Sequence, residues 1–247
     1  MPDVKGTWSS TGLRATAFFA PGTPKLNELS LLGIFGIEPE QVTAMPAQKS
    51  RFEMATMGLG HLNLQVQSNR ADLIWSATPS APGQIGDLGE LDEVVESLVT
   101  PFEQTLGETG SPVHRLAIGG IRTFVADDQD QIVPMLRGIF PRLELDDDIS
   151  DFFFSINRPV MGEVDGFKMK INRIMKWSQM QSSGLQFEVT PNGLVQQAAP
   201  PVFGVALEFD VNTHPGNNLF FTEGSISAVF DSLRGELGFV TAVPANV

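Results

Sequence analysis

The hydrophobic pattern of this chain changes its period several times, and this limits the fold more than any other feature of the sequence. In four segments, apolar residues recur at spacings of three and four, which is typical of amphipathic helices. In nine others, the period is close to two, which is typical of strands with one buried face. The pattern predicts an α+β fold in which an antiparallel sheet carries helices packed on one face.

Capping residues indicate where the helices should begin and end. We expect a first helix that begins at Thr23 and ends at Gly36, and a second that begins at Asp87. Proline cannot donate the backbone hydrogen bond of a helix interior, so Pro101 should kink or split the second helix. A third helix should follow the acidic turn that begins at Asp127.

The fourth helix has the strongest pattern in the chain. Thr222 is a suitable N-cap, and Glu223 places a carboxylate at the positive end of the helix dipole. The apolar stripe that follows consists of Ile226, Val229, Phe230, Leu233 and Leu237. We therefore expect this helix to lie against the sheet and to complete the core.

Residues bounded by glycine, proline or asparagine mark the strands. The predicted strands are 13–20, 52–58, 62–67, 71–78, 114–126, 152–157, 167–180, 185–190 and 203–211. Asn192-Gly193 is a strong signal for a hairpin turn, because a type I′ turn needs residues that tolerate positive φ. Successive hairpins predict an antiparallel meander.

The order of elements suggests a repeat. Residues 1–110 give a strand, a helix, several strands and a long helix, and residues 111–247 give this order again with extra strands. Two short matches accompany it, residues 31–35 with 136–140 and Trp75-Ser76 with Trp177-Ser178. Two interpretations stay open, two similar α+β halves about a pseudo-twofold axis or one continuous domain.

Composition argues against several classes of protein. The chain has no cysteine, which removes disulfides, thiol nucleophiles and cysteine-ligated metals. Its formal charge of −13 opposes binding to nucleic acid, because phosphate contacts require Lys and Arg. No apolar run approaches the roughly 20 residues needed to span a bilayer, so we expect no membrane association. Residues 1–6 lack the features of a secretory signal, and a cytoplasmic, bacterial-type location is therefore expected.

Motifs for cofactors and metals are also missing. Gly58-Leu59-Gly60 begins like a dinucleotide turn but lacks the third glycine, and no P-loop is present, so no cofactor is expected. His61, His114 and His214 are too far apart in sequence to share a helix face for zinc. The carboxylates of 144–151 do not follow the calcium-loop pattern, and we interpret them as a solvated acidic loop without a metal.

Basic residues are the remaining candidates for a site. On the strand 167–180, Lys168, Lys170 and Lys176 should share one face, which suits a solvated or partner-binding surface. Arg173 falls among the apolar residues of the other face, where an unpaired guanidinium is costly. Arg173 is therefore in a strand bulge, in a structural ion pair or in an anion-recognition site. Arg122 has the same three interpretations on its own strand.

The segments 114–122 and 205–211, the latter followed by the final helix to Thr241, resemble a sporadically distributed bacterial family of uncharacterised proteins of similar length. This sequence has Gly119-Gly120-Ile121 and Thr123 where that family tends toward bulky and aromatic residues. The family has no assigned activity. The resemblance implies an accessory bacterial protein and carries no catalytic residue across.

Two hypotheses on function follow. The first is a non-catalytic binding or accessory module that acts on another protein, with a basic partner favoured by the charge and self-association left open. The alternative is a small-molecule-binding protein or an enzyme with a pocket between sheet and helices, with His114 near Arg115 as a candidate pair. A compact pocket with converging polar groups would favour the alternative, and a large flat apolar patch would favour the first.

Overall fold

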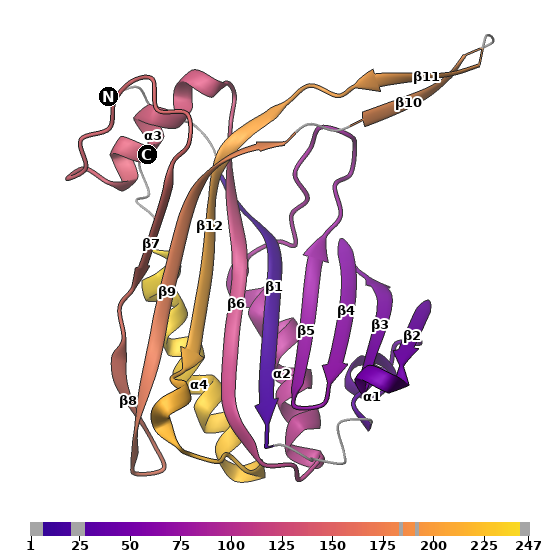
Figure 1. The fold of residues 1–247 in the computed structure, drawn as a ribbon, viewed down its shortest axis with the longest axis vertical. Helices are drawn as coiled ribbons and strands as arrows, with labels where there is room; N and C mark the ends of the chain where they lie inside the picture. The colour runs from indigo at the N-terminus through magenta and orange to yellow at the C-terminus, as the bar shows by residue number, and fades with distance from the viewer. Residues whose placement is uncertain (1–6, 21–27, 183–184, 191–192, 243–247) are drawn as a thin grey trace.

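The computed structural model describes residues 7–20, 28–182, 185–190 and 193–242. Their centre is a ten-stranded antiparallel sheet in the order β2-β3-β4-β5-β1-β6-β12-β9-β7, with β8 also paired to β9 (Figure 1). The strands of this sheet are β1 (Trp8–Phe19), β2 (Gln41–Met45), β3 (Ser50–Met57), β4 (Gly60–Gln67), β5 (Arg70–Ala77), β6 (Val113–Ala126), β7 (Phe153–Asn157), β8 (Val160–Val164), β9 (Phe167–Ser182) and β12 (Val202–Thr213). A separate hairpin of β10 (Leu185–Thr190) and β11 (Gly193–Ala198) projects from the end of the sheet (Figure 1).

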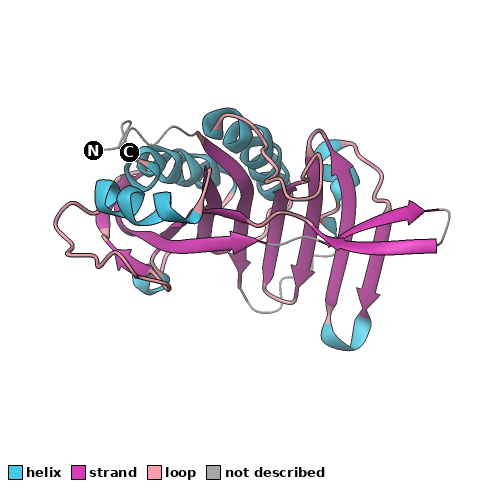
Figure 2. Ribbon diagram, turned by 90° about the horizontal axis from the view of Figure 1, so that it is seen from above, coloured by secondary structure: helices cyan, strands magenta, loops and turns pink. Residues whose placement is uncertain are grey.

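Four α-helices pack against the sheet, and Figure 2 shows them on one side of it. They are α1 (Leu31–Phe35), α2 (Leu91–Glu108), α3 (Ile132–Ile139) and α4 (Glu223–Thr241). The predicted α+β class with helices on one face is confirmed. We call the other side of the sheet the open face. None of the helices in the described part of the chain is long and apolar enough to cross a membrane.

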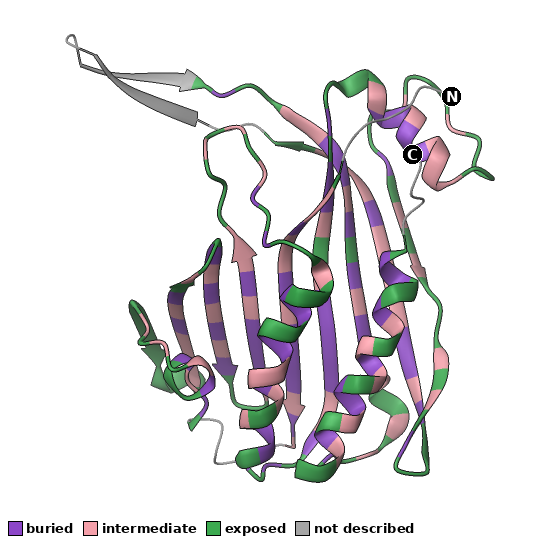
Figure 3. Ribbon diagram, turned by 180° about the vertical axis from the view of Figure 1, so that it is seen from behind, coloured by how far each residue is buried: buried purple, intermediate pink, exposed green. Residues whose placement is uncertain are grey.

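The core lies between the sheet and the helices. Helices α2 and α4 lie side by side, with buried and exposed residues alternating along both (Figure 3). Their largest fully buried side chains are Phe102 and Phe230, which belong to one cluster with Phe19 of β1 and Phe209 of β12. A second cluster, under α3, contains Leu136 and other apolar residues from β6, β9 and β12. Because the first cluster draws on both parts of the chain, the sheet and its core are continuous.

The topology repeats the same order of elements twice. Strand β1 is followed by α1 and by strands that return to pair β5 with β1, and α2 comes next. Strand β6 is followed by α3 and by strands that return to pair β12 with β6, and α4 comes next. The match of 31–35 with 136–140 falls on α1 and the end of α3, which hold equivalent places in this order.

The second sequence match does not fall on equivalent strands. Trp75 lies on β5, which pairs directly with β1, whereas Trp177 lies on β9, which is separated from β6 by β12. A common origin of 1–110 and 111–247 therefore stays a proposal that depends on topology and on the helix match. The boundary falls in the connection between α2 and β6.

Two predicted helices begin later than expected. Helix α1 begins after Ser30, whose Oγ accepts a hydrogen bond from the Gly33 N–H at 3.0 Å, and Thr23 lies outside the described residues. Helix α2 begins at Leu91, because Gly89 has a φ of 108° and interrupts the helical conformation; the Asp87 carboxylate accepts from the Ser10 N–H of β1 at 2.9 Å and from the Gly89 N–H at 3.0 Å. Helix α2 also runs through Pro101 without being split.

The end of α1 and the starts of α3 and α4 agree with the positions predicted from the sequence. Gly36 follows α1 in the left-handed conformation at φ 69°, as expected of a C-cap glycine. The Asp128 side chain accepts from the Gln131 N–H just before α3, and Thr222 is the N-cap of α4. The five residues of the predicted stripe on α4 are all buried. The prediction for this helix is confirmed.

All nine predicted strands are present. Of the three further strands among the described residues, β11 was implied only as the second arm of the predicted hairpin, and β2 and β8 were missed. Strand β2 has no alternation to detect, because all five of its residues are exposed at the edge of the sheet. Strand β8 is short and contains Gly162, which weakens a strand pattern. The predicted hairpin is confirmed by the pairing of Thr190 with Gly193, although Asn192 lies outside the described residues.

Helix α4 offers a small test of its own packing. Gly235 is exposed in the helix interior, and an added Cβ atom would meet nothing within 4 Å. Alanine has a smaller backbone entropy cost than glycine, so Gly235→Ala should raise the free energy of unfolding by about 0.5–1 kcal/mol. Urea unfolding followed by circular dichroism measures the change, and a lower stability would show that this face of α4 is not free.

Candidate functional site

The basic residues of β9 divide between the two faces as the alternation predicts. Pairing of β9 with β12 runs from Val202 opposite Ser182 to Thr213 opposite Ile171 without a shift of register, so β9 has no bulge against this neighbour. Lys168, Lys170 and Lys176 therefore lie in phase with one another on the open face, and Arg173 lies in phase with the residues under α4.

Arg173 joins the sheet to α4. Its Nη1 donates to Glu236 Oε2 of α4 at 3.0 Å, and its Nε donates to the Arg158 carbonyl at 2.8 Å. Its guanidinium carbon also lies 3.8 Å from the centre of the Phe239 ring. These contacts neutralise the charge, so the structural ion pair is the interpretation of Arg173 that the geometry favours.

Arg122 also lies on the helix side. Its Nη1 is 3.4 Å from the Thr241 carbonyl oxygen at the C-terminus of α4, and its guanidinium carbon lies 5.9 Å from the centre of the Trp8 ring. Burial lowers the pKa of Arg122, and the nearby carboxylates of Glu90 and Asp87 oppose that shift. A cation at the negative end of a helix stabilises the helix, so Arg122 has a structural role.

The lysines of β9 do not form a compact site. Lys176 Nζ pairs with Glu208 Oε1 of β12 at 2.7 Å, and both side chains are partly exposed. The side chains of Lys168 and Lys170 have no ion pair with any residue that the structure describes. Such exposed groups contribute little binding energy unless a partner covers them.

A different group of arginines lies at the centre of the open face. Arg14 of β1, Arg70 of β5 and Arg115 of β6 come from three adjacent strands, and Asp72 and Asp210 lie among them. We call these five residues the arginine cluster. Sequence reasoning had noted only Arg115, as a neighbour of His114.

Arg14 reaches across a neighbouring strand. Its Nη2 pairs with Asp210 Oδ2 at 2.9 Å, although β6 lies between β1 and β12. Gly119 of β6 is the Cα partner of both Arg14 and Asp210, and a Cβ atom there would lie 3.3 Å from Arg14 Nη2. The missing side chain at residue 119 therefore provides the path for this ion pair.

Arg70 and Asp72 form a close ion pair on β5. Arg70 Nη2 donates to Asp72 Oδ1 at 2.7 Å, and Arg70 Nε lies 2.6 Å from Asp72 Oδ2. The buried Thr16 hydroxyl donates to Asp72 Oδ1 at 2.7 Å. Asp72 is thus fully engaged, and the charge of Arg70 is neutralised.

Arg115 is the one guanidinium of the arginine cluster without a carboxylate partner among the described residues. Its Nη2 donates to Asn212 Oδ1 at 3.0 Å, and among the described residues its Nε, which is buried, and its Nη1 have no hydrogen-bond partner. Burial lowers the pKa of Arg115, as do Arg70 and Arg14, while Asp210 raises it. The cluster holds three cations and two anions, which leaves one positive charge in excess.

Two further contacts fix the position of Arg115. The guanidinium carbons of Arg115 and Arg70 lie 4.9 Å and 5.0 Å from the centre of the Phe18 ring on β1. They come from β6 and β5, the strands on either side of β1. Asn212 is held in turn, since its Nδ2 donates to Asp210 Oδ1 at 2.5 Å and its Oδ1 accepts from Asn172 Nδ2 at 3.0 Å. The guanidinium is therefore preorganised rather than free to rotate.

The histidines and the acidic loop are spread over several elements. His61 lies on β4, and His214 accepts from the Gly216 N–H in a turn after β12. His114 is next to Arg115, with its ring centre 6.2 Å from that of Phe18. Asp147 of the acidic loop pairs with Arg137 at 2.7 Å. Within the described part of the chain, no group of three His, Asp or Glu residues could hold a metal ion.

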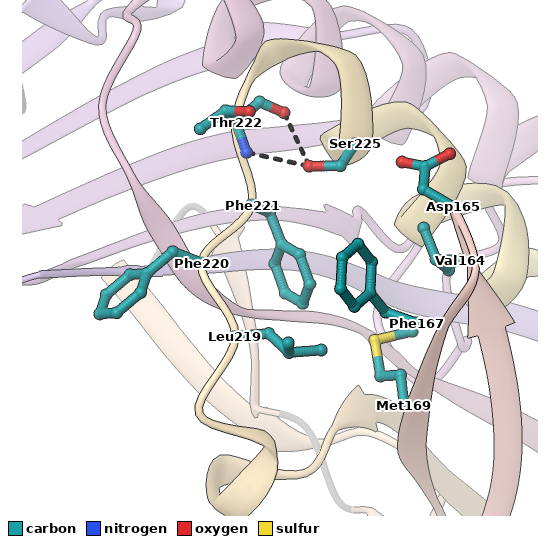
Figure 4. Close-up of a pocket in the computed structure, with 9 residues that line it drawn as sticks. All are labelled: Val164, Asp165, Phe167, Met169, Leu219, Phe220, Phe221, Thr222 and Ser225. Carbon is teal, nitrogen blue, oxygen red and sulfur yellow. Dashed lines mark hydrogen bonds between the residues drawn. The ribbon is translucent and has the colours of Figure 1, made fainter.

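A small apolar pocket lies at one end of the sheet, between the β8–β9 hairpin and the start of α4 (Figure 4). Its volume is about 270 Å³, and it is lined by Phe167, Phe220 and neighbouring apolar residues. The Ser225 hydroxyl at its rim is already bonded to the backbone of Thr222. Ligand pockets usually enclose about 300–1,000 Å³, so this one suits a side chain better than a cofactor.

A wider depression of about 550 Å³ lies at the β2 edge of the sheet and is lined by residues of β2, β3 and β4. Both hollows lie away from the arginine cluster in the sheet order. The polar residues Asp165 and Ser225 line the first hollow, and the second has a mostly polar lining that includes no residue of an α-helix.

No protein-family model matches this chain, and no curated protein is significantly similar to it. The resemblance to the sporadic bacterial family therefore stays a prediction from residues 114–122 and 205–211.

Proposed function

We propose that this protein is a non-catalytic binding module that acts on another protein and engages it with the open face of the sheet. The observation that carries the proposal is the arginine cluster, in which Arg115 is positioned by Phe18 and Asn212 yet has no carboxylate partner among the described residues. A positioned, half-buried charge without its counter-ion is costly to the free protein and becomes favourable when a partner supplies that ion.

The geometry supports the binding hypothesis better than the enzyme hypothesis. The groups that converge on the open face are guanidinium, carboxamide and carboxylate groups that are tied to one another by hydrogen bonds. A catalytic carboxylate needs to exchange a proton, and those of Asp72 and Asp210 are held as ion-pair partners. The centre of the open face is polar, so it is not the large flat apolar patch that would have favoured the first hypothesis. We therefore propose recognition by charge and hydrogen bonds.

The proposal can be tested with cell extract and three forms of the full chain. The bait is the wild-type protein, Arg115→Glu, which reverses the charge of the open face, or Ser227→Glu, which adds the same kind of charge to the helix side. Ser227 is exposed on α4 and so provides a matched position. We expect quantitative mass spectrometry to find a protein that wild type and Ser227→Glu enrich and that Arg115→Glu loses.

The enriched protein must then bind purified wild-type protein in a defined stoichiometry. Equal retention by Arg115→Glu and wild type would contradict use of the open face. Turnover of a small molecule that depends on Arg115, without any protein partner, would favour the enzyme hypothesis instead.

A further inference from the structure

We infer that the arginine cluster is a binding site for a single carboxylate, supplied by a glutamate or aspartate of the partner protein at the centre of the contact. This inference rests on the proposed function and adds the chemistry of the group that is recognised. Four observations support it, namely charge balance, the free donors, the shape of the face and the charge of the whole chain.

The charge balance points to one monovalent anion. Arg14 and Arg70 are paired with Asp210 and Asp72, and Arg115 has only the neutral Asn212 amide. One carboxylate would bring the five ionised groups to neutrality. A phosphate group carries up to two negative charges, and it would leave the cluster with an excess of negative charge in a protein whose formal charge is already −13.

The donors needed for a carboxylate are available. Arg115 Nη1 and Arg14 Nη1 have no hydrogen-bond partner among the described residues, whereas both nitrogen atoms of Arg70 that face Asp72 are occupied. Phe18 holds the guanidinium of Arg115 by a cation–π contact, which leaves its in-plane N–H groups for a ligand. Arg14 pairs with Asp210, and Arg115 donates to Asn212, which itself donates to Asp210, so both guanidinium groups border the same carboxylate and amide.

The strand between them carries small residues beneath the cluster. Strand β6 presents Ala117 and Gly119 to the open face, opposite Thr16 and Arg14 of β1. Longer side chains at 117 or 119 would fill the centre of the face. The side chains of the cluster lie over these residues, since Ala117 and Thr16 are almost completely buried. The Arg14 side chain stays 36% exposed, so a carboxylate can meet the guanidinium groups from the outer side of the cluster.

The charge of the whole chain restricts the rest of the partner segment. A strongly acidic segment would be repelled by a protein of charge −13, whereas a basic segment with one embedded carboxylate would be attracted overall and neutralised locally. This reconciles the basic partner expected from composition with a carboxylate at the centre. The arginine cluster then selects the central carboxylate of the segment, and the long-range electrostatic field of the acidic protein favours the basic residues around it.

Two end-blocked peptides test the inference, because long-range attraction and a carboxylate site predict opposite preferences between them. Both have the sequence Lys-Thr-Val-Thr-X-Thr-Val-Thr-Lys, with X either glutamate or glutamine. Long-range attraction alone makes the acidic protein prefer the glutamine peptide, because it is more positive by one charge. A carboxylate site makes it prefer the glutamate peptide. We expect fluorescence anisotropy at low salt to show about tenfold tighter binding of the glutamate peptide to wild type.

Three variants assign the preference to the site. Arg115→Gln should abolish or reverse the preference, and Arg115→Lys should keep part of it because the charge remains without the guanidinium fork. Arg142→Gln removes the same charge from an exposed position after α3, and it should change the affinity for either peptide by no more than about twofold. Urea midpoints of all variants verify that they are folded.

Several outcomes would overturn the inference. They are a preference of wild type for the glutamine peptide, the same glutamate preference in Arg115→Gln, and no binding of either peptide at millimolar concentration. Inorganic phosphate that binds at Arg115 while the glutamate peptide does not would also overturn it and would assign a phosphate ligand. If any of these results occurs while Arg115→Glu still loses a partner protein from cell extract, the proposed function stands. The chemistry of recognition would then differ from a single carboxylate.

Discussion

Replacing Phe230 by alanine should lower the free energy of unfolding by about 3–5 kcal/mol, which is a large share of the 5–15 kcal/mol typical of a folded domain. The Phe230 side chain of α4 is fully buried in the cluster that also contains Phe102 of α2 and Phe209 of β12. Removal of the ring loses its transfer free energy and leaves a cavity where α2, α4 and the sheet meet. Urea unfolding, followed by tryptophan fluorescence, measures the change.

Ser227 provides the control for this experiment, because it is exposed on α4, three residues before Phe230. Ser227→Ala should change the stability by no more than about 0.5 kcal/mol. If Phe230→Ala costs no more than Ser227→Ala, α4 is not packed on the sheet in solution. Its apolar stripe would then be a surface for a partner, and the open face would lose its place as the favoured contact.

Local chemistry explains which parts of the fold could be predicted. The stripe of α4 and the alternation of β9 were visible because each is a repeated pattern within one element. The start of α2 was misplaced because the Asp87 carboxylate bonds to Ser10, a residue 77 positions away, and no local rule reveals that contact. Strand β2 was missed because both of its faces are exposed, so burial leaves no pattern in its sequence.

The arginine cluster was harder to find than the fold for the same reason. Arg14 lies in phase with Thr16 and Phe18, opposite the buried Leu13, Ala15 and Ala17, so alternation alone could place it on the open face. That it meets Asp210, 196 residues later, depends on the pairing of β1 with β6 and of β6 with β12. Strand order is a global property, and the sequence pattern of single strands does not encode it.

The two adjacent glycines of β6 each have a separate physical role. Gly119 faces the open side, where it makes room for the guanidinium of Arg14. Gly120 is the Cα partner of Phe209, whose ring lies close above it in the core. The adjacent glycines therefore serve opposite faces of the sheet, one for the site and one for packing.

Replacing Gly120 by valine should consequently cost about 3 kcal/mol or more of stability, at the upper end of overpacking effects. A Cβ atom at residue 120 would lie 2.6 Å from the Gly12 carbonyl oxygen and 2.7 Å from the ring of Phe209. The carbonyl belongs to the backbone of β1 and cannot rotate away. The ring is almost completely buried, so it has no space to move into. The substitution must therefore separate β1 from β6 or expel Phe209 from the core.

Gly12→Val is the matched control, because Gly12 lies on the neighbouring strand and an added Cβ atom there would have only the Trp75 carbonyl oxygen, 3.8 Å away, as a close neighbour. Valine is favoured in strands, so this variant should stay within about 1 kcal/mol of wild type. Urea unfolding of both variants decides the question. Equal stability of Gly120→Val and Gly12→Val would mean that Phe209 does not pack over β6. The junction of β1 with β6, and the arginine cluster built across it, would then need a different geometry.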